Sequence, residues 1–253
     1  MKILGVIPAR YASTRFPGKP LVVIDGKTMI RRVYEQAIQC MELSKVVVAT
    51  DHEAIIDHVR SFGGTVMNTG EHHNSGTERC REVVEALALA GENYDCVINI
   101  QGDEPYIDPR QISQVARCFD NPQVQIATLI QKITSPEELS SGNVVKVVVD
   151  QQGYALLFSR SVIPYTRGRL PEEWLAATTY YKHVGIYGYQ ASVLEKIVSL
   201  PVSGLERAES LEQLRWLDHG FKILTRVTEY ESIAVDIPAD LLKFTNRTGT
   251  FLQ

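Results

Sequence analysis

Short apolar runs alternate with longer amphipathic segments through the first half of the chain. The apolar runs have the length and branching of buried strands, and they lie at residues 3–7, 46–49, 65–67 and 96–100. The amphipathic segments repeat their apolar positions with a helical period, and they lie at residues 28–39, 52–61, 75–90 and 109–119. Alternating strands and helices with short connections predict a doubly wound, Rossmann-like α/β fold of three layers.

The second half of the chain has more strands and shorter helices. Strands are predicted at residues 126–130, 144–149, 155–158, 183–189 and 223–228. Helices are predicted at residues 191–199 and 210–218, and from Asp236 to about residue 246. The turn sequence at residues 150–153 predicts a β-hairpin. No repeat or linker interrupts the pattern, so we expect one domain over residues 1–253, with a smaller lobe at about 135–205 on the edge of a mixed sheet.

Composition limits the class of protein. With 44% hydrophobic and 22% charged residues in 253, the chain has the composition of a globular domain. A net charge of −4 argues against a general nucleic-acid binder. No stretch approaches the roughly 20 apolar residues of a membrane span, and the start is too short for a signal peptide. Four cysteines without C-x-x-C spacing favour reduced, buried thiols, and we expect a cytoplasmic protein.

A basic segment at residues 8–19 follows the first predicted strand and holds Arg10, Arg15 and Lys19. Ligands of open α/β sheets bind outside the carboxyl ends of the strands, where this segment lies. Arginine offers a planar fork to phosphate oxygens, and lysine a mobile point charge. On spacing alone, a phosphate-binding loop and a solvated basic loop are equally good interpretations.

Two aspartates follow apolar runs in the same manner. Asp103 comes just after the strand at 96–100, and Asp236 follows the apolar residues 233–235. Each has a structural interpretation, Asp103 as a turn former and Asp236 as a helix N-cap. Mg²⁺ binds one or two carboxylates together with phosphate oxygens, so the basic loop favours a metal site instead. We therefore expect these aspartates and the basic loop to converge on one polyanion.

Other motifs indicate a nucleotide-binding site and exclude several classes of protein. Residues 75–79 place Ser75, a glycine and Thr77 at a helix N-terminus, where free backbone N–H groups can bind a base edge or an anion. Neither a P-loop motif nor G-x-G-x-x-G is present, which argues against a P-loop NTPase and a dinucleotide oxidoreductase. His52 and His58 are six apart and fall on different helix faces, unlike a zinc helix. The adjacent histidines at 72–73 are expected in an exposed loop.

Several segments together resemble one family, the CMP-KDO synthetases (3-deoxy-manno-octulosonate cytidylyltransferases). They are residues 8–21, 49–51, 75–79, 101–105, 158–160, 183–189, 211–215 and 235–236. The first segment alone is typical of any sugar nucleotidyltransferase, whereas all of them in order cover nearly the whole chain. The resemblance implies a nucleotidyltransferase-type fold and a Mg²⁺-dependent reaction in which CTP and a 3-deoxy-ulosonic acid give the CMP-sugar and pyrophosphate. It also implies a role in lipopolysaccharide assembly and a homodimer, with the lobe at 135–205 contributing sugar binding and dimer contacts.

The resemblance also implies roles for single residues. Catalytic roles fall on Arg10, Lys19, Asp103 and Asp236, of which the two aspartates hold Mg²⁺. Nucleotide contacts fall on Ala9, Arg10, Ser13, Arg15, Lys19, Ser75, Gly76, Arg79 and Gln101. Sugar contacts fall on Gln101, Arg160, His183, Tyr187, Glu212 and Gln213.

Alternatives stay open at this point. Arg160 is the natural cation for the substrate carboxylate, and His183 could instead be a hydrogen-bonded strand histidine. Residues 166–179 and the C-terminal tail match no family pattern, so a close variant of the sugar, such as an 8-amino derivative, or another sugar acid is an alternative substrate. A nucleotide-binding protein that lost the chemistry is the alternative outside enzymes, and the presence of both aspartates argues against it.

Overall fold

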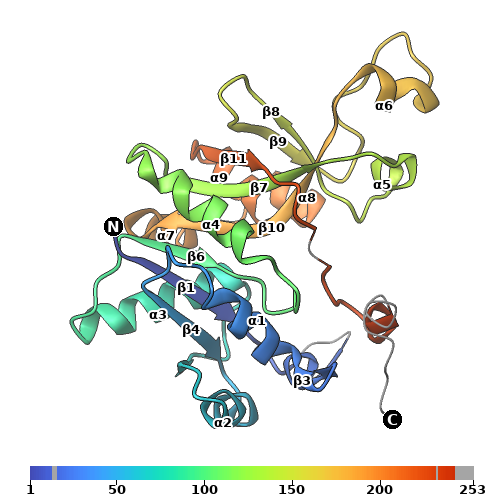
Figure 1. The fold of residues 1–253 in the computed structure, drawn as a ribbon. Helices are drawn as coiled ribbons and strands as arrows, with labels where there is room; N and C mark the ends of the chain where they lie inside the picture. Colours follow the sequence, from blue (N-terminus) through green and yellow to red (C-terminus); the bar gives the residue numbers. More distant parts are fainter. Residues whose placement is uncertain (13–15, 232, 243–253) are drawn as a thin grey trace.

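A twisted mixed sheet runs through the computed structural model, which describes residues 1–12, 16–231 and 233–242 (Figure 1). The strand order is β11-β7-β10-β6-β1-β4-β5, with β8 and β9 added beside β10. The strands of this sheet are β1 Ile3–Pro8, β4 Lys45–Thr50, β5 Val66–Asn68, β6 Cys96–Asn99, β7 Ile126–Lys132, β8 Lys146–Val149, β9 Ala155–Ser159, β10 Tyr181–Gln190 and β11 Ile223–Val227. A separate small ribbon pairs β2 Val23–Ile24 with β3 Lys27–Thr28.

Helices cover both faces of the sheet. The α-helices are α1 Met29–Ala37, α2 Glu53–Ser61, α3 Gly76–Leu89, α4 Pro109–Arg117, α5 Pro136–Ser140, α6 Trp174–Ala177, α7 Ala191–Val198, α8 Gly204–Glu209 and α9 Gln213–Asp218. The 3₁₀ turns are η1 Lys19–Leu21, η2 Cys118–Asp120, η3 Pro171–Glu173 and η4 Pro238–Leu241.

Alternation along β1 shows how the layers form. Ile3 and Ile7 point to one face and pack with α1, α2 and α4, whereas Leu4 and Val6 point to the other and pack with α3, α7 and α9. β1, β4, β5 and β6 are parallel, and β10 is antiparallel to both of its neighbours β6 and β7. The predicted three-layer mixed sheet is therefore confirmed.

Most predicted elements form near their predicted bounds, including the hairpin of β8 and β9. The prediction of one helix over residues 210–218 was wrong at its start. Ser210 has a left-handed backbone with φ of 52°, which ends α8, and α9 begins only at Gln213. Helix α8 was not predicted, although Ser203 and Glu206 form a complete capping box at its start. The helix expected from Asp236 is a 3₁₀ turn over Pro238–Leu241, and the rest of that prediction lies outside the described residues.

The segment between β7 and β10 folds as a smaller unit beside the main sheet (Figure 1). It holds α5, the β8–β9 hairpin and α6, and it has its own apolar cluster around Ile133, Leu139 and Tyr180. β8 pairs with the start of β10, which attaches this lobe to the sheet. The roles expected of the lobe in sugar binding and dimer contacts remain predictions.

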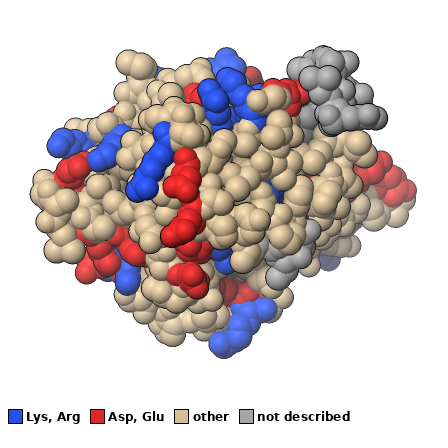
Figure 2. Space-filling model, turned by 90° about the horizontal axis from the view of Figure 1, so that it is seen from below, with Lys and Arg blue, Asp and Glu red and all other residues tan. Residues whose placement is uncertain are grey.

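Two expectations from composition can be compared with the structure. Cys40, Cys80, Cys96 and Cys118 are all buried and unpaired, as predicted. In the described part of the chain, no helix combines the length and the apolar character that crossing a membrane requires. On the face shown in Figure 2, acidic and basic side chains are interspersed among other residues.

Candidate active site

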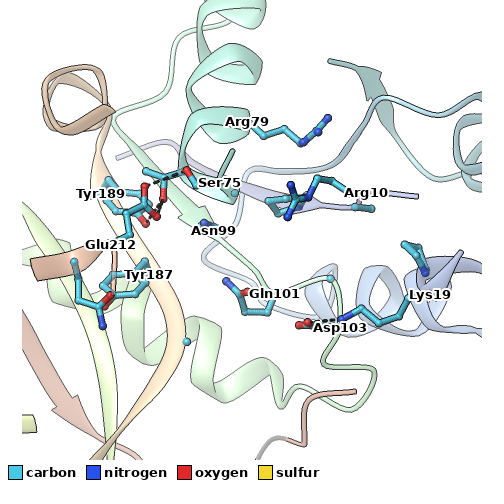
Figure 3. Close-up of a pocket in the computed structure, with 18 of the residues that line it drawn as sticks. Arg10, Lys19, Ser75, Arg79, Asn99, Gln101, Asp103, Tyr187, Tyr189 and Glu212 are labelled. Carbon is cyan, nitrogen blue, oxygen red and sulfur yellow. Dashed lines mark hydrogen bonds and ion pairs between the residues drawn. The ribbon is translucent and has the colours of Figure 1, made fainter. Parts of the chain in front are cut away.

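A cleft opens at the carboxyl ends of β1 and β6, on the side of the sheet that α3 and α9 cover (Figure 3). Its volume is about 350 Å³. The predicted site residues that line it are Ala9, Arg10, Lys19, Ser75, Gly76, Arg79, Gln101, Asp103, Tyr187, Glu212, Gln213 and Asp236. Residues from the two ends of the chain thus meet in one cavity, which is where open α/β sheets bind ligands.

Close backbone contacts shape the floor of the cleft. The Ala9 N–H donates to the Ala49 carbonyl at 2.9 Å, which extends the pairing of β1 and β4 to the start of the basic loop. A Cβ at Gly102 would lie 2.5 Å from the Pro8 carbonyl oxygen, so only glycine permits the ends of β1 and β6 to approach this closely. Arg10, the residue after Ala9, is exposed.

Contacts of Tyr11 and Gly18 hold the two ends of the described part of the basic loop together. The Gly18 N–H donates to the Tyr11 carbonyl at 2.9 Å, and Gly18 has a φ of 69° that favours glycine. The Tyr11 ring stacks on His52 with centroids 3.9 Å apart. Ser13 and Arg15, the other loop residues predicted to contact the nucleotide, lie outside the described residues.

Lys19 joins the two predicted aspartates. Its ammonium lies 2.7 Å from an Asp103 carboxylate oxygen and 4.0 Å from one of Asp236, and it also donates to the Val235 carbonyl at 2.8 Å. The approach of Asp236 follows from the packing of Val235, whose side chain is fully buried against Ile24 and Met29. The expected convergence of Lys19, Asp103 and Asp236 is therefore present in the structure.

The donor set suits a hard cation that shares its coordination with a ligand. Among the described residues, no group of three or more His, Cys, Asp or Glu side chains forms a metal cage. Asp103 and Asp236 instead both lie within 4.0 Å of one ammonium, that of Lys19. Two carboxylates and no further protein ligand match the needs of Mg²⁺, which takes its remaining oxygens from phosphates and water.

The N-terminus of α3 forms the opposite wall. The Ser75 hydroxyl accepts from the Glu78 N–H at 3.2 Å, but the Glu78 carboxylate accepts from the Asn74 N–H instead of that of Ser75. Ser75 and Glu78 have the spacing of a capping box, of which only the bond to the Ser75 hydroxyl forms. A Cβ at Gly76 would lie 3.1 Å from Asn99 Nδ2, so the absence of a side chain keeps this wall open.

Glu212 is a carboxylate held deep in the cleft. It accepts hydrogen bonds from the Ser75 hydroxyl at 3.0 Å and the Thr77 hydroxyl at 2.9 Å. Burial raises the pKa of Glu212 above the usual value, and the two hydroxyls act in the opposite direction. Tyr187 and Tyr189 lie beside it, and the Trp216 ring is nearly perpendicular to both tyrosine rings. This end of the cleft offers hydroxyl-binding and aromatic groups rather than cations.

Arg79 lines the cleft but is 1% exposed. Its guanidinium donates to the Asp51 carboxylate at 2.7 Å and to the Thr69 hydroxyl. The arginine therefore supports the wall of the cleft through an ion pair. The Ala49-Thr50-Asp51 segment carried part of the resemblance, but no role was assigned to Asp51.

Arg160 and His183 do not line the main cleft. The Arg160 guanidinium donates to the carbonyls of Glu209, at 2.7 Å, and Gly142, at 3.1 Å, so it connects the lobe to the end of α8. His183 lines a neighbouring cavity of about 260 Å³, with Gly185 between the two, and its Nε2 lies 3.2 Å from the Thr128 hydroxyl. Sugar binding by these two residues remains a prediction.

His183 gives stability a pH dependence. Burial lowers its pKa to about 4 from the ordinary 6.5. Between those values the unfolded chain binds a proton that the folded chain excludes, so stability falls as pH falls. We expect wild type to lose up to about 2 kcal/mol more than His183→Gln between pH 7 and pH 5. Urea unfolding of both proteins at the two pH values measures this difference, and equal losses would show that His183 titrates normally.

Sequence patterns missed other residues of the cleft. Asn99, Tyr189 and Trp216 line it, and Asn99 could have been found as the polar residue that ends an apolar strand. The expectation that His73 lies in an exposed loop was wrong. Its ring is buried beside the Glu82 carboxylate, which also accepts from the Gly70 N–H.

Comparison with known proteins defines the class first: a family model described as cytidylyltransferase matches residues 4–223. A 3-deoxy-manno-octulosonate cytidylyltransferase of Phocaeicola vulgatus is 51% identical over 246 residues, and one of Parabacteroides distasonis is 50% identical over 247, each with 96% of both chains covered. A solved structure of CMP:2-keto-3-deoxy-manno-octonic acid synthetase complexed with CTP superposes with a TM-score of 0.89 at 42% identity, over 98% of this chain and 99% of that one. The chain therefore belongs to the 3-deoxy-manno-octulosonate cytidylyltransferase family, which confirms the resemblance.

Proposed function

We propose that this protein transfers the cytidylyl group of CTP to 3-deoxy-manno-octulosonate and releases pyrophosphate. The observation that carries the proposal is the meeting of Lys19, Asp103 and Asp236 in one cleft, in a chain about half identical to enzymes with this name. A binding protein has little need for two carboxylates facing the cations of a phosphate site. We place the reaction in the cytoplasm, which the four unpaired cysteines favour, and assign its product to lipopolysaccharide assembly.

The reaction needs positioning and charge neutralisation more than a dedicated base. The anomeric hydroxyl of the sugar attacks the α-phosphorus in line with the departing pyrophosphate. In this proposal Arg10 and Lys19 bind the triphosphate, and Gln101, which lines the same cleft, contacts the reacting groups. Glu212 and Gln213, which lie at the end of the cleft near Tyr187 and Tyr189, bind sugar hydroxyls, because a carboxylate and an amide can hydrogen-bond to hydroxyl groups.

Asp103 and Asp236 would hold Mg²⁺ when substrate is bound. The ion would neutralise phosphate charge and lower the pKa of the attacking hydroxyl. Lys19, which pairs with both aspartates in the free protein, would then bind phosphate oxygens instead. We also expect two copies of the chain to associate as a homodimer through the lobe, which light scattering of the purified protein tests.

The proposal is tested by pyrophosphate release from CTP, UTP, ATP and GTP, each with 3-deoxy-manno-octulosonate, its 8-amino derivative and N-acetylneuraminate. We expect release with CTP and the first sugar only. Release with the 8-amino sugar instead would establish the alternative substrate. CTP binding without release for any pair would establish a nucleotide-binding protein without this chemistry.

Lys19→Ala tests the phosphate site. We expect CTP affinity to fall at least about tenfold and turnover to slow, because the variant lacks a direct charge on the triphosphate. Calorimetry and initial rates measure the two effects. Lys27→Ala is the matched control, since Lys27 is an exposed lysine near the same loop whose partner is Glu35. Unchanged affinity and rate in Lys19→Ala would remove the loop from the phosphate site.

A further inference from the structure

Among the described residues that line the cleft, Asn99, Tyr187 and Trp216 each have a buried polar atom without a hydrogen-bond partner, and only that of Asn99 belongs to an amide. Asn99 is 5% exposed, and within the described part of the chain its Oδ1 makes no hydrogen bond. The neighbouring residues of β6, Val97 and Ile98, are fully buried and apolar. A buried amide oxygen without a hydrogen bond destabilises a fold, so an apolar side chain at this position would stabilise the sheet more. Because this oxygen lowers the stability of the free protein, its presence indicates that it hydrogen-bonds to a ligand.

The side chain of Asn99 faces the cleft. Side chains alternate along a strand, so Asn99 lies on the same face as Val97, which packs on the side of α3. In the sheet, Asn99 stands opposite Val6 of β1 and Tyr187 of β10, which places it in the middle of the floor. It is a lining residue of the cleft, and Figure 3 shows it between the α3 wall and Gln101.

The local surroundings indicate which part of a substrate lies there. The amide is next to Gly76, where a Cβ would lie 3.1 Å from Nδ2 and 3.4 Å from Oδ1. Lys19 and Asp103, which suit the phosphates, lie on the other side of Gln101 (Figure 3). A carboxamide offers both a donor and an acceptor, which suits a neutral group with mixed polarity and not a polyanion. A pyrimidine edge and a ribose hydroxyl have that polarity.

We propose that the side-chain amide of Asn99 hydrogen-bonds to the nucleoside of bound CTP and contributes to nucleotide specificity. The inference rests on the proposed function, because it assumes that CTP occupies this cleft. The bound nucleoside supplies the partner that Oδ1 lacks in the free protein. Affinity for the correct nucleotide then depends on a group whose removal leaves the fold intact.

The test measures nucleotide binding by calorimetry without sugar acid, for wild type, Asn99→Ala and the isosteric Asn99→Asp. We expect CTP affinity to fall about tenfold or more in both variants, with no decrease in melting temperature for Asn99→Ala. Gln111→Ala is the matched control. Gln111 is a buried amide on α4, outside the cleft, whose Oε1 also lacks a partner among the described residues but whose Nε2 donates to the Tyr230 carbonyl at 2.9 Å. That variant is expected to melt earlier and to bind CTP normally.

Three further ligands locate the contact. If wild type and Asn99→Ala bind 2′-deoxy-CTP with equal affinity, the contact is to the ribose. If they bind UTP with equal affinity, the contact is to the base. An equal difference for CTP, 2′-deoxy-CTP and UTP still supports a nucleoside contact, provided that tripolyphosphate binds both proteins alike. The proposal is overturned if both variants bind CTP as wild type does, or if tripolyphosphate binding weakens equally. Failure of wild type to bind CTP would instead overturn the proposed function.

Discussion

Replacing Asp103 by asparagine should lower turnover at least about a hundredfold while the protein stays folded. Asp103 is one of two carboxylates at the phosphate end of the cleft, and its oxygen lies 2.7 Å from the Lys19 ammonium. Asparagine has nearly the same shape but no charge, so it would weaken the proposed Mg²⁺ site and removes the ion pair that holds the Lys19 ammonium. Steady-state kinetics with CTP and the sugar acid measure the loss.

The fold should survive this change because backbone contacts hold the region. The Val235 N–H donates to the Asp103 carbonyl at 2.9 Å, and Lys19 keeps its bond to the Val235 carbonyl. Asp57→Asn, which removes an exposed carboxylate on α2, is the matched control and should retain wild-type rates. Melting curves exclude unfolding as the cause. A folded Asp103→Asn protein with near-normal kcat would contradict the assignment of Asp103 to the metal site.

The sequence predicted the meeting of Arg10 and Asp103 because each follows a strand of the same parallel sheet. Apolar runs located β1 and β6, whose carboxyl ends must lie at one edge of the sheet, so Arg10 and Asp103 line one cleft. Asp236 was harder to place from pattern alone, since its approach depends on the burial of Val235 more than 200 positions from Ile24 and Met29. The resemblance to a known family supplied that link.

Local pattern did not reveal contacts that depend on the backbone of distant segments. Arg160 looked like a free cation for a substrate carboxylate, yet its donors reach carbonyls of Glu209 and Gly142. Ser210 ends α8 through its left-handed backbone, which the apolar period of the segment does not show. Such features arise from tertiary packing, so only the structure locates them.

The pair of Asp51 and Arg79 should make Asp51→Ala the most destabilising of the substitutions considered, at about 3 kcal/mol of unfolding free energy. The Arg79 side chain is 1% exposed, and the Asp51 carboxylate, 15% exposed, accepts from it at 2.7 Å. Removing the acid leaves a buried guanidinium whose remaining partner here is the Thr69 hydroxyl. Asp51→Asn keeps an acceptor and should lose less. Urea unfolding of the three proteins measures these differences.

An exposed ion pair provides the matched comparison. Glu35 pairs near the surface with Lys27 at 2.6 Å and with Arg31 at 2.9 Å, and Glu35→Ala should cost less than about 1 kcal/mol because water solvates both freed cations. If Asp51→Ala costs no more than Glu35→Ala, the buried pair does not support the fold. Since Arg79 also lines the cleft, CTP affinity should fall in Asp51→Ala and stay unchanged in Glu35→Ala. A stability loss without a loss of affinity would limit the pair to a structural role, whereas the loss of both would show that the wall of the nucleotide site depends on this one buried charge pair.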